Sequence, residues 1–492
     1  MLSPTRAWAR LGAPGTRPAR TPTGRQAQMA SRKDLLKAHS FITQRLHSAL
    51  INRDPDDVQK PLRRVGTGTF IGIMIGVLVM AGFGIVGLLT SGGTSNWQED
   101  NSVIIDETSG GVYAFVGGKL YPTANIASAR LVTGNADSPK GVKAKSLQGF
   151  PQEHMIGIPD APAALPAADS LNAYPLRVCA TRPDGEDRRF TTLEIGGATV
   201  PDHSSAFAVR DSRGTEYLVV DGRAHRVPLT AGQGRSAVLI ELGFTEIMTP
   251  GDAFIRALPQ GTPLGMVEIP NLNEQSNRPI EGVGNLVGTV VRVEAAAGDA
   301  YYVLLRDGLA RIKPLDARFM ALEQGVDVQT IDSTTASQST ILSQTLSAED
   351  IPNYLPTPDQ QQPNLSTATA CATWTSPTEP PLMALGVLTP NVNAEAPAGQ
   401  ADAVVIPALS GALVRNEGAA ADGSPMFLLT AGRAYGIPDK QSRDALGYGG
   451  AEIQEIPPQL LALVPNGLPA GVTLSVEFAK QPVTSGDDDE NG

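Results

Sequence analysis

The sequence predicts a mainly β protein with some α-helix, held by a single membrane span and carrying an external body of four repeats. Three observations support this fold class: one uncharged apolar segment, a reversal of net charge across it, and four similar hairpin patterns beyond it. The 492 residues include 51 Gly and 39 Pro, so turns are frequent, whereas charged residues make up only 18%. This composition disfavours a charged coiled-coil rod and stays below the Gly and Pro content of disordered chains.

The uncharged apolar stretch 70–89 is long enough to cross a membrane. A helix rises 1.5 Å per residue, so 20 residues cover about 30 Å, which is the hydrocarbon thickness of a bilayer. We place the transmembrane helix at residues 66–89, with Arg63 and Arg64 at its boundary. A cleaved signal peptide is the alternative, but its apolar region would be shorter and nearer the N-terminus.

The net charge changes sign across this span. The first 64 residues hold 13 Lys and Arg against 4 Asp and Glu, and the remaining 428 hold 26 against 46. Because Lys and Arg concentrate on the cytoplasmic side of membrane proteins, we expect residues 1–64 inside the cell and the rest outside. The whole chain carries −11, which argues against a nucleic-acid-binding protein.

Three glycines on one face of the span predict a helix-packing surface. Gly68, Gly72 and Gly76 are spaced four residues apart, and small residues at that spacing let two helices approach closely in lipid. Glycine is also frequent in membrane helices in general, so the pattern is compatible with a span that has no partner helix.

The residues before the span predict a disordered leader at 1–28 and a cytoplasmic amphipathic helix within 29–64. One apolar stripe of this helix is formed by Leu35, Ile42, Leu46 and Ala49. A single helix cannot build a core of its own. We therefore expect the stripe to dock onto a partner protein, with the membrane surface as the alternative.

Cys179 and Cys371 are the only cysteines in the sequence, and both lie beyond the span. Thiols outside the cytoplasm oxidise, and an even pair most simply forms one disulfide. The bond would close a loop of about 190 residues and stabilise the fold by at most about 5 kcal/mol. A redox pair would call for C-x-x-C spacing, and a metal site for closer ligands, so both alternatives are disfavoured.

Four segments beyond the span share a β-rich run, a glycine and a short return run that reaches a proline. They are residues 113–122, 217–228, 303–314 and 427–438, with Gly118, Gly222, Gly308 and Gly432 as the glycines. Glycine supplies the positive φ that tight hairpin turns require, and proline ends strand pairing. We therefore expect four hairpins with these glycines at their turns.

The rest of the external body, assigned to residues 90–484, contains one conspicuous linker. Residues 332–370 are rich in Ser, Thr, Gln and Pro and predict a long flexible loop before Cys371. Residues 485–492 are acidic and predict a disordered tail.

The sequence holds no motif for catalysis or nucleotide binding. The patterns G-x-x-x-x-G-K-[ST], H-E-x-x-H and G-x-S-x-G do not occur. Gly118-Lys119 comes nearest to a phosphate-binding loop, but Tyr113 stands where its first glycine belongs. We therefore expect no catalytic residue, no cofactor and no metal, and lean against an enzyme.

The cytoplasmic helix and the region of the first hairpin resemble the EccB family, core membrane components of actinobacterial type VII (ESX) secretion systems. The matching helix positions are His39, Phe41, Arg45, Ala49, Leu50 and Asp54. The family motif G-x-L-x-P-x-x-N-x-x-S-A-R-L is similar to Gly118-Lys119-Leu120-Tyr121-Pro122, Asn125 and Ser128-Ala129-Arg130-Leu131. Cys179 and Cys371 correspond to the family's external disulfide. Members usually carry Trp shortly before the first cysteine, where this sequence has Leu176-Arg177-Val178.

The resemblance implies an elongated, quasi-two-fold external body in which the four repeats surround a central β domain. It implies a single-pass protein of the inner (plasma) membrane, with a cytoplasmic N-terminus, an external or periplasmic C-terminal body and a hexameric assembly. The cytoplasmic helix would dock onto EccC, EccD and EccE through Leu35, His39, Phe41, Ile42, Arg45, Leu46 and Ala49. A mycosin protease is a further implied partner.

The role that follows is a structural core subunit of the secretion complex. Some family members carry an ATPase label, for which this sequence offers no nucleotide site of known geometry. An atypical ATPase, a wall hydrolase and a membrane-anchored surface binding protein are the alternatives.

Overall fold

The chain forms two compact units, residues Met1–Gly93 and Thr94–Gly492, which are described one at a time. The computed structural model describes residues 32–52, 61–91, 95–183, 188–202, 204–228, 236–265, 267–296, 298–324, 327–358, 364–387, 396–397, 399–420 and 423–483. The predicted leader 1–28 and the predicted tail 485–492 lie outside these residues.

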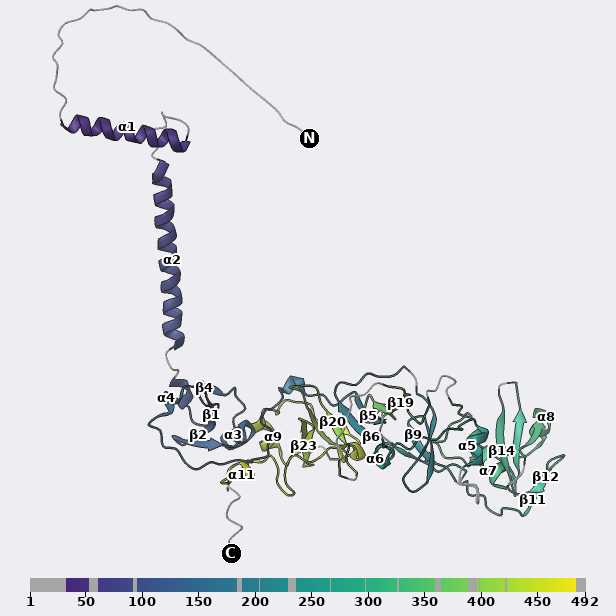
Figure 1. The fold of residues 1–492 in the computed structure, drawn as a ribbon. Helices are drawn as coiled ribbons and strands as arrows, with labels where there is room; N and C mark the ends of the chain where they lie inside the picture. Colours follow the sequence, from purple (N-terminus) through teal and green to yellow (C-terminus); the bar gives the residue numbers. More distant parts are fainter. Residues whose placement is uncertain are drawn as a thin grey trace, which may run out of the picture. The chain divides into compact units, whose positions relative to one another are not determined.

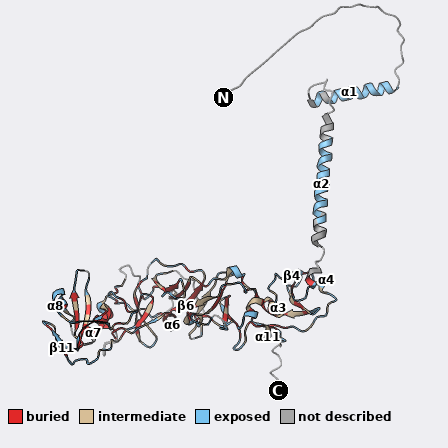
Figure 2. Ribbon diagram, turned by 180° about the vertical axis from the view of Figure 1, so that it is seen from behind, coloured by how far each residue is buried: buried red, intermediate tan, exposed pale blue. Residues whose placement is uncertain are grey.

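The N-terminal unit contains two helices, α1 (Arg32–Asn52) and α2 (Pro61–Ser91) (Figure 1). In the described part of the chain, α2 is the one helix long and apolar enough to cross a membrane, with its most apolar window at Gly66–Phe83. The helix begins five residues before the predicted span and therefore includes Arg63 and Arg64. Proline is favoured at the first position of a helix, so Pro61 accounts for the early start. Figure 2 colours both helices as exposed where their burial is described, and Gly76 alone among those residues is intermediate.

The C-terminal unit contains four antiparallel hairpins at the positions where the sequence pattern recurs. They are β2 (Val112–Val116) with β3 (Lys119–Thr123), β8 (Glu216–Val220) with β9 (Arg223–Arg226), β14 (Ala300–Leu305) with β15 (Gly308–Ile312), and β22 (Met426–Thr430) with β23 (Arg433–Ile437). A preceding strand pairs with each: β1 (Ser102–Asp106), β7 (Phe207–Arg210), β13 (Val290–Glu294) and β21 (Ala412–Asn416). We call the four resulting sheets the first to fourth hairpin sheets.

Three of the four hairpin turns use the predicted glycine. Gly118, Gly222 and Gly432 have φ of 74°, 71° and 74°, and the residue before each also has a positive φ. Two successive positive φ values define the type I′ turn, whose twist matches that of paired strands. Glycine adopts this conformation without steric cost.

The turn assignment of Gly308 is wrong, because this residue is the first of β15 and pairs with Leu305. The turn itself consists of Arg306 and Asp307, which lie between the paired ends. A Cβ at position 308 would stand 2.4 Å from the carbonyl oxygen of Thr340. A close approach of two backbones, together with a φ of 150°, is therefore the reason for this glycine.

The prediction that proline ends each hairpin is wrong for the first. Pro122 lies inside β3 and pairs with Tyr113. The strand order β3-β2-β1-β4 puts β3 beside a single named strand, and its other side forms only isolated bridges at Leu120 and Thr123. Such interrupted pairing tolerates a residue that has no N–H. Pro228 and Pro438 do follow β9 and β23, and Pro314 begins the next helix.

After its hairpin, each sheet continues with the same order of elements. First comes a helix: α3 (Ile126–Thr133), α5 (Ala237–Glu241), α7 (Pro314–Gln324) or α9 (Lys440–Leu446). Next comes a residue or strand parallel to the sheet's first strand: β4 (Lys140–Val142), Met248, β16 (Gln329–Asp332) or β24 (Gln454–Ile456).

A second short helix follows: α4 (Ala144–Leu147), α6 (Asp252–Ala257), α8 (Ser333–Gln338) or α10 (Pro458–Leu461). The last segment runs parallel to the hairpin's return strand: Gln152, β10 (Gln260–Gly261), β17 (Ile341–Thr345) or Asn466. The four hairpin sheets thus share one topology.

The prediction of a flexible loop over residues 332–370 is wrong in its first part, which forms α8 and β17. The carboxylate of Asp332 accepts a hydrogen bond of 2.7 Å from the N–H of Thr335 and caps α8. β17 then pairs with β15. Composition could not reveal either feature, because the strand partner lies about thirty residues earlier in the chain.

A fifth sheet, of five strands, stands between the hairpin sheets. Its order is β19 (Leu382–Leu385), β18 (Ala370–Trp374), β5 (Leu176–Thr181), β6 (Phe190–Ile195) and β20 (Ala403–Val405). We call it the central sheet. The chain enters it between the first and second hairpin sheets and returns to it between the third and fourth. The other elements are 3-10 helices at Ser95–Gln98 and Ala168–Ser170, the ribbon β11 (Gln275–Ile280) with β12 (Gly284–Leu286), and α11 (Val476–Ala479).

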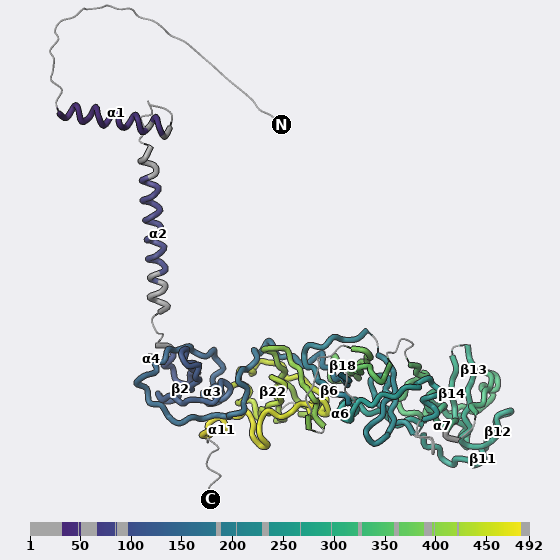
Figure 3. Tube along the Cα trace, viewed as in Figure 1, coloured from purple at the N-terminus to yellow at the C-terminus, as the bar shows by residue number. Residues whose placement is uncertain are grey.

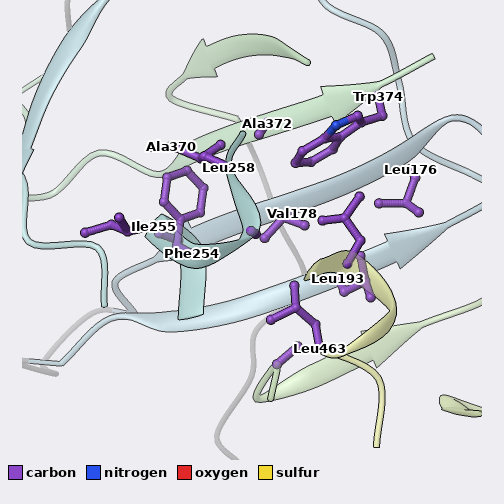
Figure 4. Packing of buried hydrophobic residues seen from close by; sticks show 14 of the residues in the cluster. Leu176, Val178, Leu193, Phe254, Ile255, Leu258, Ala370, Ala372, Trp374 and Leu463 are labelled. Carbon is purple, nitrogen blue, oxygen red and sulfur yellow. The ribbon is translucent and has the colours of Figure 1, made fainter. Parts of the chain in front are cut away.

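The largest hydrophobic core joins the central sheet to the second and fourth hairpin sheets. Figure 4 shows Leu176, Val178 and Leu193 of the central sheet in one cluster with Phe254 and Ile255 of α6. Separate cores join the first sheet to the fourth and the second to the third. Figure 3 accordingly shows α11, near the end of the chain, beside α3 of the first sheet.

Candidate functional site

The apolar stripe predicted on α1 is fully open in the structure. Leu35, Ile42 and Leu46 are 64%, 60% and 58% exposed, and Ala49 is also exposed. Burying one large aliphatic side chain is favourable by about 1.5–3 kcal/mol relative to leaving it exposed to water. The stripe is therefore a surface that a partner or the membrane interface would cover.

The same helix carries further exposed apolar side chains outside the stripe, among them Phe41. Phe41 precedes Ile42 by one residue, which places it about 100° around an ideal helix. The guanidinium carbon of Arg45 lies 5.7 Å from the centre of the Phe41 ring, a cation–π contact. His39 accepts at its carbonyl oxygen from the Thr43 hydroxyl, 2.7 Å away. Leu50 is exposed, and Asp54 lies outside the described residues.

The glycine face of α2 forms an open groove. A Cβ added at Gly68, Gly72 or Gly76 would have no atom within 4 Å. Large apolar side chains such as Phe70 and Met80 are 65% and 70% exposed along the same helix. The surface of α2 is thus suited to lipid, with a strip narrow enough for a second helix to approach.

The structure joins Cys179 and Cys371, 192 residues apart, in one disulfide. The two residues are direct partners across β5 and β18, and neither side chain is exposed. The bond therefore links the two passages of the chain through the central sheet. Trp374 lies opposite Leu176 in the same pairing and is buried.

A buried arginine holds the segment that leads into β18. Arg189 donates hydrogen bonds to the carbonyl oxygens of Leu365, Ser366 and Ala368. Burial, with a smaller effect of Arg182, lowers the pKa of Arg189 to about 10, so the guanidinium stays charged at neutral pH. These contacts attach the end of the predicted loop to the residue that precedes β6.

The residues of the family-like motif meet at the start of α3. Asn125 caps the helix through its side-chain oxygen, which accepts from the N–H of Ser128 at 2.9 Å. The Asn125 amide donates to the carbonyl oxygen of Ile158 at 2.7 Å, and the Ser128 hydroxyl accepts from the Ile158 N–H at 2.9 Å. Two short polar side chains thereby fix a strand-like segment 30 residues away.

Arg130, from the same motif, reaches the fourth hairpin sheet. Its guanidinium donates to the carbonyl oxygen of Leu446, the last residue of α9, at 2.8 Å. A cation at a helix C-terminus satisfies free carbonyl groups and the helix dipole. The motif is thus a joint between two sheets that are distant in sequence, a role that no local signal indicates.

The second and third hairpin sheets meet through a comparable pair of helices. Arg318 of α7 lies 3.1 Å from Glu241 at the end of α5, and Leu239 and Phe319 share one buried core. The joints of the first with the fourth sheet and of the second with the third therefore both use the helix that follows the hairpin.

Three surface clefts of the C-terminal unit have volumes of about 500, 400 and 450 Å³. The third is lined by Arg188, Arg256, Asp252 and Asp402, among others. Its carboxylates already have partners, since Asp402 accepts from Arg188 at 2.6 Å and Asp252 from Ser212 at 2.7 Å. Across the described residues, His, Cys, Asp and Glu side chains form no group of three that could hold a metal.

Comparison with known families identifies one match over most of the chain. The family described as "Type VII secretion system ESX-1, transport TM domain B" matches residues 28–481. The relative named "ESX-1 secretion system ATPase EccB1" from Mycolicibacterium smegmatis (strain MKD8) is 28% identical over 282 residues. The match covers 55% of this chain and 57% of that relative, so the chain spans just over half the length of this curated relative.

Two solved structures have the same fold. A chain of an intact ESX-5 inner membrane complex aligns with a TM-score of 0.60 and 23% identity, covering 94% of this chain and 97% of that one. A structure of an EccB3 dimer from the ESX-3 core complex aligns with a TM-score of 0.61 and 22% identity, covering 77% of this chain and all of that one.

Proposed function

Because this chain belongs to the EccB family of type VII secretion components, we propose that it is a structural core subunit of an ESX-type membrane complex. The observation that carries the proposal is that the two units differ in how they expose their apolar residues. The N-terminal unit leaves the α1 stripe and the α2 glycine groove open. The C-terminal unit buries its apolar residues in several cores and lacks a recognisable catalytic motif.

The proposed orientation puts α1 in the cytoplasm and the C-terminal unit outside. Thirteen Lys and Arg precede residue 65 against four Asp and Glu, which favours the cytoplasm for this side of α2. The buried disulfide supports an oxidising compartment for the C-terminal unit. The protein would then be a single-pass component of the inner membrane.

We further propose that the four hairpin sheets are structural repeats arranged with quasi-two-fold symmetry around the central sheet. Their common element order supports this reading. So does the pairing of helices, since α3 contacts α9, α5 contacts α7, and α6 contacts α10. The antiparallel match of Cys179 with Cys371 falls between the two halves.

The partners proposed for the α1 stripe are the other membrane components, EccC, EccD and EccE, within a hexameric assembly. A mycosin protease is a further proposed partner of the external body. The similar structures are those of an inner membrane complex and of a dimer, which supports self-association and complex formation as the general role.

An atypical ATPase is the second candidate, because the names of relatives contain that word. Against it stands the lack of a phosphate-binding loop motif in the sequence. The cleft with Arg188, Arg256 and Asp402 is the place where an anion would find positive charge. Nucleotide turnover by the purified full chain, abolished by Arg256→Ala, would establish this candidate in place of the structural one.

The test of the structural role is the double substitution Ile42→Asp and Leu46→Asp in the full chain. We expect the variant to insert in the membrane but to lose the co-purifying complex, because two buried carboxylates would oppose docking. Ser40→Asp with Gln44→Asp adds the same charge on the opposite side of α1 and should leave the complex intact. A complex that survives the first substitution contradicts docking through the stripe.

A further inference from the structure

In three of the four hairpin sheets the pairing along the outer side of the return strand begins at a proline. The N–H groups of Leu120, Ala224 and Ala434 each donate at 2.9 Å to a proline carbonyl, those of Pro151, Pro259 and Pro465. In the second and fourth sheets another proline, Pro263 or Pro469, follows four residues later. Since proline cannot continue a ladder, the pairing there is confined to one or two residues.

The third hairpin sheet departs from this arrangement. The equivalent N–H, that of Leu309, donates at 2.8 Å to the carbonyl oxygen of Thr340 instead of a proline. The chain then continues as the five-residue strand β17. The run 339–347 contains neither a proline nor a charged residue.

β17 is the outermost strand of its sheet, and its side chains are open. The strand order is β16-β13-β14-β15-β17, with β17 paired to β15 alone. Ile341 is 49% exposed, and Ser343, Gln344 and Thr345 are also exposed. Among the described residues, no hydrogen bond from another segment reaches the side of residues 341–345 away from β15. Proteins protect such edges with charges, prolines, bulges or short strand length, because an unprotected edge pairs with other strands, and β17 lacks the first two of these.

The pairing of β17 with β15 is irregular in its middle. Leu309 pairs with Ile341 and Arg311 with Thr345, so β17 has two residues more than β15 over this interval. Ser343 is the central residue of the longer side. It is also the middle residue of β17.

We propose that β17 is an interaction edge that pairs antiparallel, about Ser343, with β17 of a second copy of this chain. A two-fold contact sets the same strand against itself, and like charges facing each other would destabilise it. β17 has no charge to repel its copy, and the pairing would place Ile341 opposite Thr345, two β-branched side chains that fit a cross-strand pair. This edge deepens the assembly role proposed above.

The proposed contact between two β17 strands is small, and membrane anchoring of both copies favours it. A five-residue strand pair buries far less than the roughly 1,000 Å² of a stable interface between free proteins. Anchoring each copy by α2 raises the effective concentration of the two edges. We therefore expect pairing in the full membrane-bound chain.

Cysteine crosslinking of the full chain in its native membranes tests the edge. The two natural cysteines are bonded to each other, so Ser343→Cys introduces the sole free thiol. Facing residues in an antiparallel pair have Cα atoms about 4.5–5.5 Å apart, within the range for a disulfide. On mild oxidation we expect a covalent dimer at least ten times more abundant than for Thr334→Cys, an exposed control on α8.

The register provides a second measurement. Ile341→Cys alone should crosslink poorly, whereas co-expressed Ile341→Cys and Thr345→Cys chains should form a mixed dimer. Equal crosslinking of Ser343→Cys and Thr334→Cys, or a crosslink of Ser343→Cys to a different protein in place of a dimer, would overturn the proposal. Ser343→Pro removes a backbone N–H from β17, and Ser343→Thr keeps this N–H and serves as its control. If chemical crosslinking traps as much dimer with Ser343→Pro as with Ser343→Thr, the proposal is also overturned.

The β17 crosslinking experiment and the α1 docking experiment can succeed or fail independently of each other. Loss of co-purifying partners in the Ile42→Asp and Leu46→Asp variant would show only that the α1 stripe is needed for docking. A β17 crosslink that persists in that variant would show that the edge acts independently of the stripe. An absent β17 crosslink beside an intact complex would reject the edge and leave the core-subunit role standing.

Discussion

Arg130 donates a hydrogen bond of 2.8 Å to the carbonyl oxygen of Leu446, across 316 residues of sequence. The bond ties α3 of the first hairpin sheet to the C-terminal end of α9 in the fourth. Around it lies a shared core that includes Leu131, Leu428 and Tyr435. The first sheet, which directly follows the span in sequence, is thereby fixed to the last part of the body.

Replacing Arg130 with Ala should weaken this joint. A charged hydrogen bond contributes about 1.5–3 kcal/mol, and its loss leaves a buried carbonyl unsatisfied. We expect a lower free energy of unfolding by that amount, measured by urea titration in detergent. Arg213→Ala, at an exposed position, should change stability by less than about 0.5 kcal/mol. Equal changes in the free energy of unfolding for the two substitutions would show that the hydrogen bond to Leu446 does not stabilise the fold.

Removing the disulfide should destabilise the body without altering the central sheet. Cys179 and Cys371 close a loop of 192 residues, for which the chain-entropy relation sets an upper limit of about 5 kcal/mol. We expect the double substitution to Ala to lower the urea midpoint and to abolish the effect of a reductant on it. A wild-type midpoint that does not respond to reductant would argue against this stabilising role.

Gly467→Ala should strain the fourth hairpin sheet. An added Cβ would lie 2.3 Å from the Cε1 atom of Tyr435, a ring that is only 5% exposed. Overpacking of this kind costs about 1–3 kcal/mol, which thermal unfolding would detect. Gly450→Ala meets no atom within 4 Å and serves as the control. Adding Tyr435→Leu to Gly467→Ala should restore part of the loss if the ring is the cause.

Gly72→Leu should interfere with packing of α2 against another helix. The groove at this position is empty, so the larger side chain has room in the isolated chain and should not prevent insertion. We expect a reduced yield of the assembled complex by native mass measurement of detergent extracts. Val77→Leu lies about 140° around the helix from Gly72 and should leave the yield unchanged. A normal yield with Gly72→Leu would remove the glycine face from the assembly.

Several features were predictable because their signals are local. The length and apolar character of residues 70–89 identify a candidate span. The turns at Gly118, Gly222 and Gly432 follow from the φ requirement of two-residue hairpin loops. The family resemblance, read from motifs spread along the chain, is confirmed by the match over residues 28–481.

The sequence alone determined a charge-asymmetric chain with one candidate span, two cysteines beyond it and four recurring hairpin patterns. Only the tertiary structure decided that Gly308 serves a close approach to Thr340, that Pro122 lies inside β3, and that residues 341–345 pair with β15. It also decided that Arg130 joins the first sheet to the fourth. The physical reason is that turn chemistry and hydrophobic periodicity act within a few residues. Strand partners and interhelix hydrogen bonds, by contrast, depend on segments brought together across tens to hundreds of residues.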